Sequence, residues 1–181
     1  MSDEHFPESA PEPLPEPAPV TLTPIGVIRT PFAARENMPI QPSGARGVEG
    51  RIVLRPDLAP ALRDLDGFSH LLLLYHFHRS SGYDLIVTPF LDDTPRGLFA
   101  TRAPRRPNPL GVSVVRLVGV EGNVLRIADI DVLDGTPLLD IKPHVPAFDA
   151  PEGARAGWLE RTAVQAGAQR SDGRFVEEGG A

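Results

Sequence analysis

The 181-residue sequence predicts a mostly β fold, namely a small β-barrel or strongly curved sheet with one or two short helices. Apolar, β-rich runs are short, turns containing Gly or Pro separate them, and only one segment has a clear helical pattern. The dinucleotide fingerprint GxGxxG is missing, because Gly44, Gly47 and Gly50 recur every third residue and no crossover helix follows them. The fold is therefore expected to be of a non-Rossmann type.

The chain divides into three parts. Residues 1–20 form an acidic, proline-rich tail that we expect to be disordered, because it has little apolar surface to bury. Five acidic residues and no Lys or Arg stand in this tail, so it carries most of the net charge of −6. Residues 21–150 are predicted to form the β-barrel domain, and residues 151–181 a C-terminal extension that is partly helical or loose.

The strands of the domain are predicted from β-rich runs bounded by turns. They are expected at 22–29, 51–54, 68–78, 84–89, 112–120, 124–132 and 138–141. The apolar centre of 68–78 is typical of a buried central strand. The turn at 121–123 joins its two neighbours into a hairpin, and the turn Asp134-Gly135-Thr136-Pro137 is expected to return 138–141 to pair back.

One short helix is predicted at 57–65. Asp57 can cap it, Pro60 is tolerated in its first turn, and its leucines share one face. A weaker helical pattern, interrupted by glycines, covers 152–168 and includes Trp158.

The stretch 97–113, GLFATRAPRRPNPLGVS, combines three arginines, three prolines and no carboxylate. Because each proline lacks an N–H and restrains its neighbour, the stretch is expected to form neither a regular helix nor a central strand. It predicts a stiff loop that presents the guanidinium groups of Arg102, Arg105 and Arg106. An arginine-rich surface turn without function is the alternative. The acid-free segment 94–120 around it could meet a polyanion locally.

Several classes of function are disfavoured by what the sequence lacks. The absence of cysteine excludes disulfides, thiolate nucleophiles and Cys-based metal sites. The longest apolar run, 71–75, is too short to span a membrane, and the N-terminal residues do not resemble a signal peptide, so a cytoplasmic protein is expected. His76 and His78 share a strand face and could bind a metal with His70 or His144, but no carboxylate ligand is evident, so no metal site is predicted.

Four strings in order then carry a resemblance to a known family: IGVIRTPF, GFSHLLLLYHFHRS, GLFATRAPRRPNPLGVSVVRL and IDVLDGTPLLDIKPHVP. Over about residues 23–149 the chain resembles the TsaA-like family, to which the bacterial tRNA methyltransferase TrmO belongs. The resemblance implies a β-barrel, S-adenosylmethionine-dependent methyltransferase that is usually a homodimer. The implied activity is methylation of the exocyclic N6 nitrogen of threonylcarbamoyl-adenosine, next to the tRNA anticodon.

The resemblance also implies a set of cofactor contacts. It places them on Gln41, Pro42, His78, Arg79, Arg102, Val114, Asp134, Gly135, Thr136 and Pro137. Longer bacterial members carry a further C-terminal domain thought to help hold tRNA, and efficient tRNA binding by this chain would need a dimer to supply such a surface.

The chemistry of methyl transfer suggests roles for particular side chains. The cofactor's carboxylate favours an arginine, for which Arg102 is the candidate. The acceptor nitrogen is a poor nucleophile until its proton leaves, so His78 is a candidate base and Asn108 a candidate orienting residue. Arg105 and Arg106 could hold the threonine carboxylate of the substrate or tRNA phosphates.

The residues leave other functions open. A methyltransferase of the same fold could act on a small molecule, and a non-catalytic module could bind S-adenosylmethionine or RNA. A metal-dependent barrel enzyme is the fourth alternative.

Overall fold

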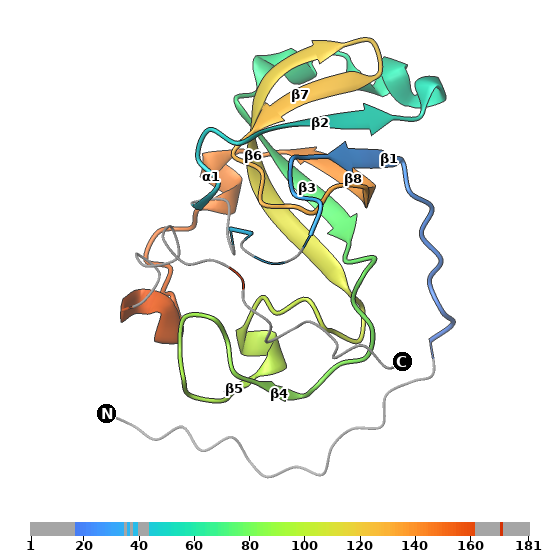
Figure 1. Ribbon diagram of the computed structural model, residues 1–181. Helices are drawn as coiled ribbons and strands as arrows, with labels where there is room; N and C mark the ends of the chain where they lie inside the picture. The colour runs from blue at the N-terminus through green and yellow to red at the C-terminus, as the bar shows by residue number, and fades with distance from the viewer. Residues whose placement is uncertain (1–16, 35, 37, 40–43, 162–170, 172–181) are drawn as a thin grey trace.

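A computed structural model describes residues 17–34, 36, 38–39, 44–161 and 171. Six antiparallel strands close into a barrel in the order β1-β2-β7-β6-β3-β8 (Figure 1). These strands are β1 (Gly26–Arg29), β2 (Glu49–Leu54), β3 (His70–His76), β6 (Leu110–Glu121), β7 (Val124–Ala128) and β8 (Thr136–Pro143). The prediction of a mostly β, barrel-like, non-Rossmann fold is confirmed.

The barrel interior is apolar because alternate residues of each strand point inward. In β3 this alternation is regular, and Leu71, Leu73 and Tyr75 are the buried positions. The fully buried side chains at its centre are Ile28, Ile52, Leu71, Leu73, Val115, Leu125, Ile127, Ile130 and Leu138. The central place predicted for this strand is also confirmed, since β3 pairs with both β6 and β8.

The strand after the Asp134 turn does not pair back as predicted. β8 pairs with β1 and β3, and not with β7. The β7 strand ends at Ala128 because Asp129 adopts a left-handed backbone with φ 65°, and the chain then crosses to β1. The prediction of a four-residue hairpin turn at 134–137 is therefore wrong: Thr136 and Pro137 are the first residues of β8.

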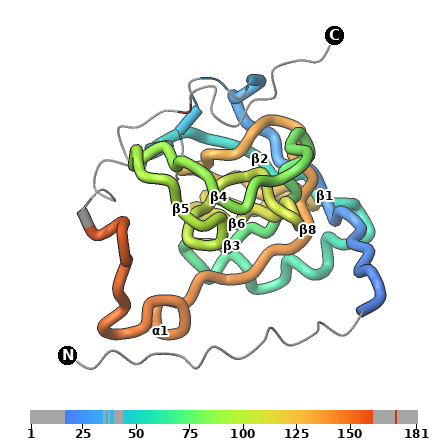
Figure 2. Tube along the Cα trace, turned by 90° about the horizontal axis from the view of Figure 1, so that it is seen from below, coloured from blue at the N-terminus to red at the C-terminus, as the bar shows by residue number. Residues whose placement is uncertain are grey.

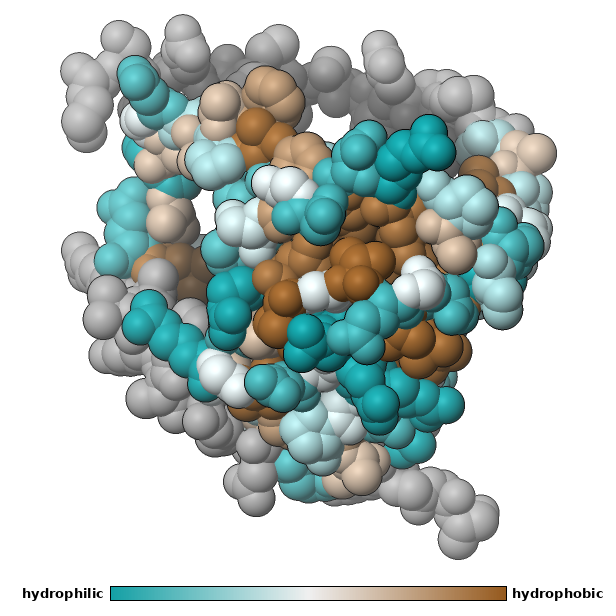
Figure 3. All heavy atoms as spheres, turned by 90° about the horizontal axis from the view of Figure 1, so that it is seen from above, coloured by the Kyte–Doolittle hydropathy of each residue, from teal (hydrophilic) through white to brown (hydrophobic). Residues whose placement is uncertain are grey.

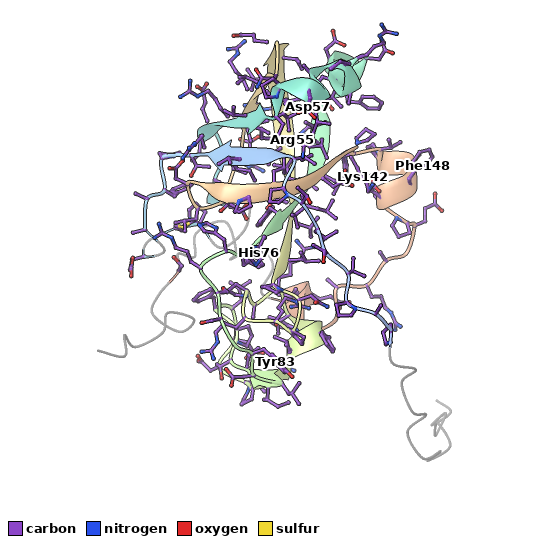
Figure 4. All side chains as sticks on the ribbon, turned by 90° about the vertical axis from the view of Figure 1, so that its right-hand side faces the viewer. Arg55, Asp57, His76, Tyr83, Lys142 and Phe148 are labelled. Carbon is purple, nitrogen blue, oxygen red and sulfur yellow. The ribbon has the colours of Figure 1, made fainter. Side chains whose placement is uncertain are left out.

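The helix predicted at 57–65 is replaced by two 3₁₀ helices. Residues Pro56–Leu62 form the 3₁₀ helix η2, and Leu65–Gly67 form the short η3. Pro60 lies inside η2, where it lacks the N–H that an α-helical hydrogen bond needs. The tighter i→i+3 pattern accommodates it. At the start of η2, Arg55 and Asp57 form an ion pair of 2.9 Å, visible at the upper end of the barrel in Figure 4.

Residues 77–109, which we call the cover segment, connect β3 to β6. They contain the two-stranded sheet of β4 (Ile86–Val87) and β5 (Arg96–Gly97), followed by η4 (Leu98–Ala100). Val87, Leu98 and Ala103 form a small core of their own. Figure 1 shows the segment beneath the barrel, and Figure 2 shows it lying across the barrel's lower end. The loop prediction for 97–113 is wrong at its end, because β6 starts at Leu110.

The chain after β8 contains α1 (Pro146–Asp149) and η5 (Gly157–Arg161). The helix predicted at 152–168 is thus limited to the single 3₁₀ turn η5 within its described part, and residues 162–168 lie outside the described residues. In the ranges given above, no helix has the length and hydropathy that a membrane crossing requires. At the upper end of the barrel, apolar side chains gather inside a hydrophilic rim (Figure 3).

Candidate functional site

The lower end of the barrel, which we call the mouth, brings together several predicted site residues. Here β1, β3 and β7 end and β6 and β8 begin. His78 follows β3 and Thr136 opens β8, yet the His78 Nδ1 and Thr136 Oγ1 atoms are 3.5 Å apart. Figure 4 shows His76 at this end, between the strands and the part of the cover segment that carries Tyr83.

The Asp134 turn is bound to the end of β1. The Thr30 N–H donates to Asp134 Oδ1 at 3.0 Å, and Arg29 lies 3.4 Å from Asp134 Oδ2. The Gly135 N–H donates to the Ile28 carbonyl at 2.9 Å. Gly135 has φ 77°, a conformation that favours glycine and lets the chain turn sharply into β8. The carboxylate and backbone of this turn are thereby fixed at the mouth.

His78 is held in a way that favours its neutral form. Burial lowers the pKa of its imidazole, and electrostatic interaction with Arg79 and His76 lowers it further. In the neutral ring one nitrogen carries a hydrogen and the other can accept a hydrogen bond. Arg79, the neighbouring predicted contact, is exposed.

Two arginines of the cover segment bind the segment itself. Arg106 Nη1 donates to the carbonyl of Thr101 at 3.0 Å and approaches the carbonyls of Leu98 and Ala103 at 3.5 and 3.4 Å. Arg105 Nη2 is 3.5 Å from Asp84 Oδ2. The structure thus gives both arginines a role in fixing the loop, while their role in substrate binding stays a prediction.

Arg102 differs from these two. It is exposed. Burial raises the pKa values of Tyr75 and Asp131, and the positive charge of Arg102 opposes that rise at both residues. The Arg102 guanidinium therefore acts on the mouth from the cover segment.

Sequence reasoning missed a polar layer inside the mouth. The Ser113 hydroxyl donates to Asp131 Oδ1 at 2.7 Å, and the Tyr75 hydroxyl lies 3.0 Å from Ser113 Oγ. Each of these residues sits among apolar neighbours, in LLLLYHF, GVSVV and IDV. A single polar residue that points inward from an apolar strand would have indicated this layer. Which residues point inward depends on the strand register, which the sequence does not specify.

Two further predicted residues, Asn108 and Val114, lie just before β6 and near its start. The Asn108 side chain is exposed, and its carbonyl accepts a 2.7 Å bond from the Leu110 N–H. Val114 is paired with Leu72 and stands on the face of β6 opposite to Ser113. Gln41 and Pro42 lie outside the described residues. The described ranges contain no group of three or more His, Cys, Asp or Glu residues that could hold a metal ion.

The C-terminal segment contacts the cover segment and the loop between β1 and β2. Trp158 Nε1 donates to the Ala100 carbonyl at 2.8 Å, and the Arg96 guanidinium lies 5.4 Å from the Trp158 ring. Met38 exchanges two hydrogen bonds with Ser171, of 2.8 and 3.0 Å. These bonds join the C-terminal segment to the cover segment and to the β1–β2 loop.

Fold and mouth together define a six-stranded β-barrel protein with a polar site at one end, built from segments far apart in the sequence. The chain belongs to the family of the tRNA-methyltransferase O N-terminal domain, whose model matches residues 27–150. The resemblance inferred from the sequence motifs is confirmed.

Known proteins similar to this chain come from archaea, bacteria and mammals. A "Probable S-adenosyl-L-methionine-binding protein" of Pyrococcus abyssi is 52% identical over 84% of this chain and 83% of that protein. The tRNA (adenine(37)-N6)-methyltransferase of Homo sapiens is 33% identical over 71% of this chain, which spans 31% of the human enzyme. The fold is similar to the crystal structure of TrmO from Pseudomonas aeruginosa, with a TM-score of 0.66 and 42% sequence identity. The match covers 78% of this chain and 63% of that chain.

Proposed function

We propose that this protein is an S-adenosylmethionine-dependent methyltransferase that acts on the N6 nitrogen of threonylcarbamoyl-adenosine next to the tRNA anticodon. The main support is the meeting of family motifs at the mouth. His78 and Thr136 are 58 residues apart in sequence and 3.5 Å apart in space, and the charge of Arg102 acts on the same region.

The chemistry of the donor set fits S-adenosylmethionine. Arg102 provides a guanidinium for a carboxylate, and the Asp134 turn provides carbonyl and carboxylate oxygens for ammonium and hydroxyl groups. The bound cofactor supplies a methyl group on a sulfonium sulfur. The protein's own part is to position the acceptor and to exclude water, which the cover segment across the mouth favours.

The decisive test is a transfer assay with the purified protein. tRNA that carries threonylcarbamoyl-adenosine is incubated with S-adenosylmethionine, and its nucleosides are analysed by mass spectrometry. We expect a gain of one methyl group on that nucleoside and none on tRNA that lacks the threonylcarbamoyl group. Transfer to the free nucleoside but not to tRNA would show a small-molecule methyltransferase. Cofactor binding without transfer to either would show a non-catalytic module.

Arg102→Ala is expected to weaken binding of S-adenosylmethionine about 10- to 100-fold. A charge-assisted pair with the cofactor carboxylate contributes about 1.5–3 kcal/mol, and alanine removes it. Isothermal titration calorimetry of the two proteins measures the difference. Arg63→Ala, at the other end of the barrel, is the control and should keep the wild-type affinity. Equal affinity of wild type and Arg102→Ala would refute the carboxylate contact.

The outer face of the barrel offers support for an RNA partner. Arg29 of β1 lies directly opposite Arg51 of β2, which lies directly opposite Arg126 of β7. Like charges at opposed positions destabilise a sheet, so the place of Arg51 between two other arginines is unfavourable for folding. Arg29 and Arg126 have acidic partners at 3.4 and 3.1 Å, whereas Arg51 makes no ion pair with any other described residue. We infer that the row contacts tRNA phosphates beside the mouth.

Arg51→Ala is therefore expected to weaken tRNA binding more at low salt than at high salt. Each phosphate contact that is lost reduces the steepness of log affinity against log salt concentration by roughly 0.7–0.9. Binding measured by fluorescence anisotropy at several salt concentrations gives the slope. Arg63→Ala, an exposed arginine next to η2 at the other end of the barrel, is the control and should keep the wild-type slope.

The resemblance further favours a homodimer in the cytoplasm. A dimer would supply additional surface for tRNA, and analytical ultracentrifugation of the purified chain tests it. A monomer at micromolar concentration that still methylates tRNA would contradict this part of the proposal.

A further inference from the structure

The polar layer inside the mouth has a defined direction of hydrogen bonding. Ser113 has one hydroxyl hydrogen, which it donates to Asp131 Oδ1 at 2.7 Å. The 3.0 Å contact between Tyr75 and Ser113 must then run from the tyrosine hydroxyl to Ser113 Oγ. The chain of bonds therefore starts at Tyr75 of β3, passes Ser113 of β6 and ends on the carboxylate of Asp131.

Asp131 keeps an oxygen available for a ligand. Within the described part of the chain, Oδ2 has no side-chain hydrogen-bond partner, and the residue is only part-buried. Its two chain neighbours, Ile130 and Val132, are buried in the core, so the backbone that carries the carboxylate is fixed. Asp131 also lies three residues before the Asp134 turn, on the segment between β7 and β8.

The surroundings of Asp131 make its carboxylate a better proton acceptor than an ordinary one. Burial raises the pKa of Asp131 to about 6, although the hydrogen bond from Ser113 and the charge of Arg102 act to lower it. Tyr75 of β3 and Arg102 of the cover segment are the titratable or charged described groups that interact with it. At neutral pH the group is ionised and close to its pKa, as efficient general base catalysis requires.

We propose that Asp131 is the catalytic base of this site, with Ser113 and Tyr75 as positioning residues that orient its carboxylate. This inference rests on the proposed function, because it identifies the group that receives the proton of the acceptor nitrogen. Asp131 Oδ2 takes the proton of N6 while the N6 lone pair forms the bond to the methyl carbon. The cofactor's sulfur keeps the electron pair of the bond that breaks, and the neutral Asp131 then releases its proton to water.

This assignment replaces His78 as the base. The environment of His78 lowers its pKa and so weakens it as a proton acceptor, whereas the environment of Asp131 has the opposite effect. The Nδ1 atom of His78 also faces the Thr136 hydroxyl, which donates to the Leu133 carbonyl at 2.8 Å. His78 is better suited to orient a ligand than to take its proton.

The test uses single-turnover methyl transfer to tRNA carrying threonylcarbamoyl-adenosine, measured from pH 5 to 8. We expect the wild-type rate to rise with pH through a midpoint near 6. Asp131→Asn should lower the rate roughly 10²- to 10⁴-fold and abolish this rise. Ser113→Ala should move the midpoint to higher pH, because it removes a bond that stabilises the carboxylate, and Ser113→Thr should restore it.

Two measurements without transfer accompany the assay. Calorimetry with S-adenosylhomocysteine should give equal affinity for wild type and Asp131→Asn. Weaker binding by the variant with an unchanged rate profile would overturn the proposal and make Asp131 a cofactor ligand. Carbon-13 NMR should show Asp131 titrating near pH 6, and a midpoint below 4.5 would equally overturn it. A wild-type protein that transfers no methyl group to tRNA, while its Asp131 titrates near 6, would instead refute the proposed function.

Discussion

Gly111→Ala is expected to destabilise the barrel by about 3 kcal/mol, the upper part of the range for overpacked cores. A Cβ atom at position 111 would lie 2.2 Å from Cε2 of Tyr75 and 2.9 Å from the ring of Phe77. Gly111 is paired directly with Tyr75 across β3 and β6, so the tyrosine ring occupies the space of the missing side chain. Any shift of that ring also moves the hydroxyl away from Ser113.

Urea denaturation of wild type and variant measures the loss. Gly119→Ala is the matched control in the same strand, because its Cβ would meet only the flexible end of Arg126, at 3.1 Å. The control is expected to stay within about 1 kcal/mol of wild type. Equal stabilities of the Gly111 and Gly119 variants would contradict the packing that the structure shows. Tyr75→Phe in the Gly111→Ala background should recover little, since the clash is with ring carbons.

Asp131→Asn is expected to make the protein more stable at pH 7.5 while it lowers activity. The pKa of this carboxyl is raised from 3.8 to about 6, so the folded state favours the protonated form. The stabilisation that comes from the raised pKa of Asp131 is fully present below the pKa that this group has in the unfolded chain. It is lost as the pH rises through the pKa of the group in the folded protein. The wild-type protein should therefore lose stability between pH 4 and pH 7, and asparagine removes that dependence.

At pH 7.5 the unfolding free energy of Asp131→Asn should exceed that of wild type by about 1–2 kcal/mol. This is less than the full pKa shift would give, because Asp131 is only part-buried. At pH 4 the two proteins should be equally stable. The measurement is the free energy of unfolding in urea at both pH values. Asp66→Asn, an exposed residue of η3, is the control and should show little change at either pH. A pH-independent difference between wild type and Asp131→Asn would rule out the raised pKa.

The barrel could be predicted from the sequence because its strands are local patterns. Alternation and turn residues located β3, β6 and β7 to within a few residues of their ends. The pairing of β8 could not be predicted, since it depends on Asp129 leaving the strand and on bonds from Gly135 to Ile28, which are far apart in the sequence. The turn chemistry of Asp134 and Gly135 fits a hairpin equally well, and only closure of the barrel decides between the two.

The site could be predicted only in part, because sequence motifs are local and the contacts between them are not. The family motifs indicated His78 and the Asp134 turn, and the structure brings His78 beside Thr136. Asp131 was missed because it stood within a predicted strand as one polar residue between Ile130 and Val132. Its burial and its contact with Ser113 arise from tertiary packing, which no local pattern encodes. Composition made the arginines of the cover segment look alike, whereas the contacts of Arg106 with three carbonyls separate it from Arg102.

These three Arg106 contacts have a thermodynamic consequence for ligand binding. A loop whose carbonyls are already held by a guanidinium loses little conformational entropy when a ligand arrives. The free energy of ligand binding at the mouth should then come mainly from the enthalpy of new polar contacts. The association rate constant should be limited by diffusion rather than by closure of the loop. In Arg106→Ala the same loop must be ordered during binding, and the entropy of association should become less favourable even where the affinity changes little.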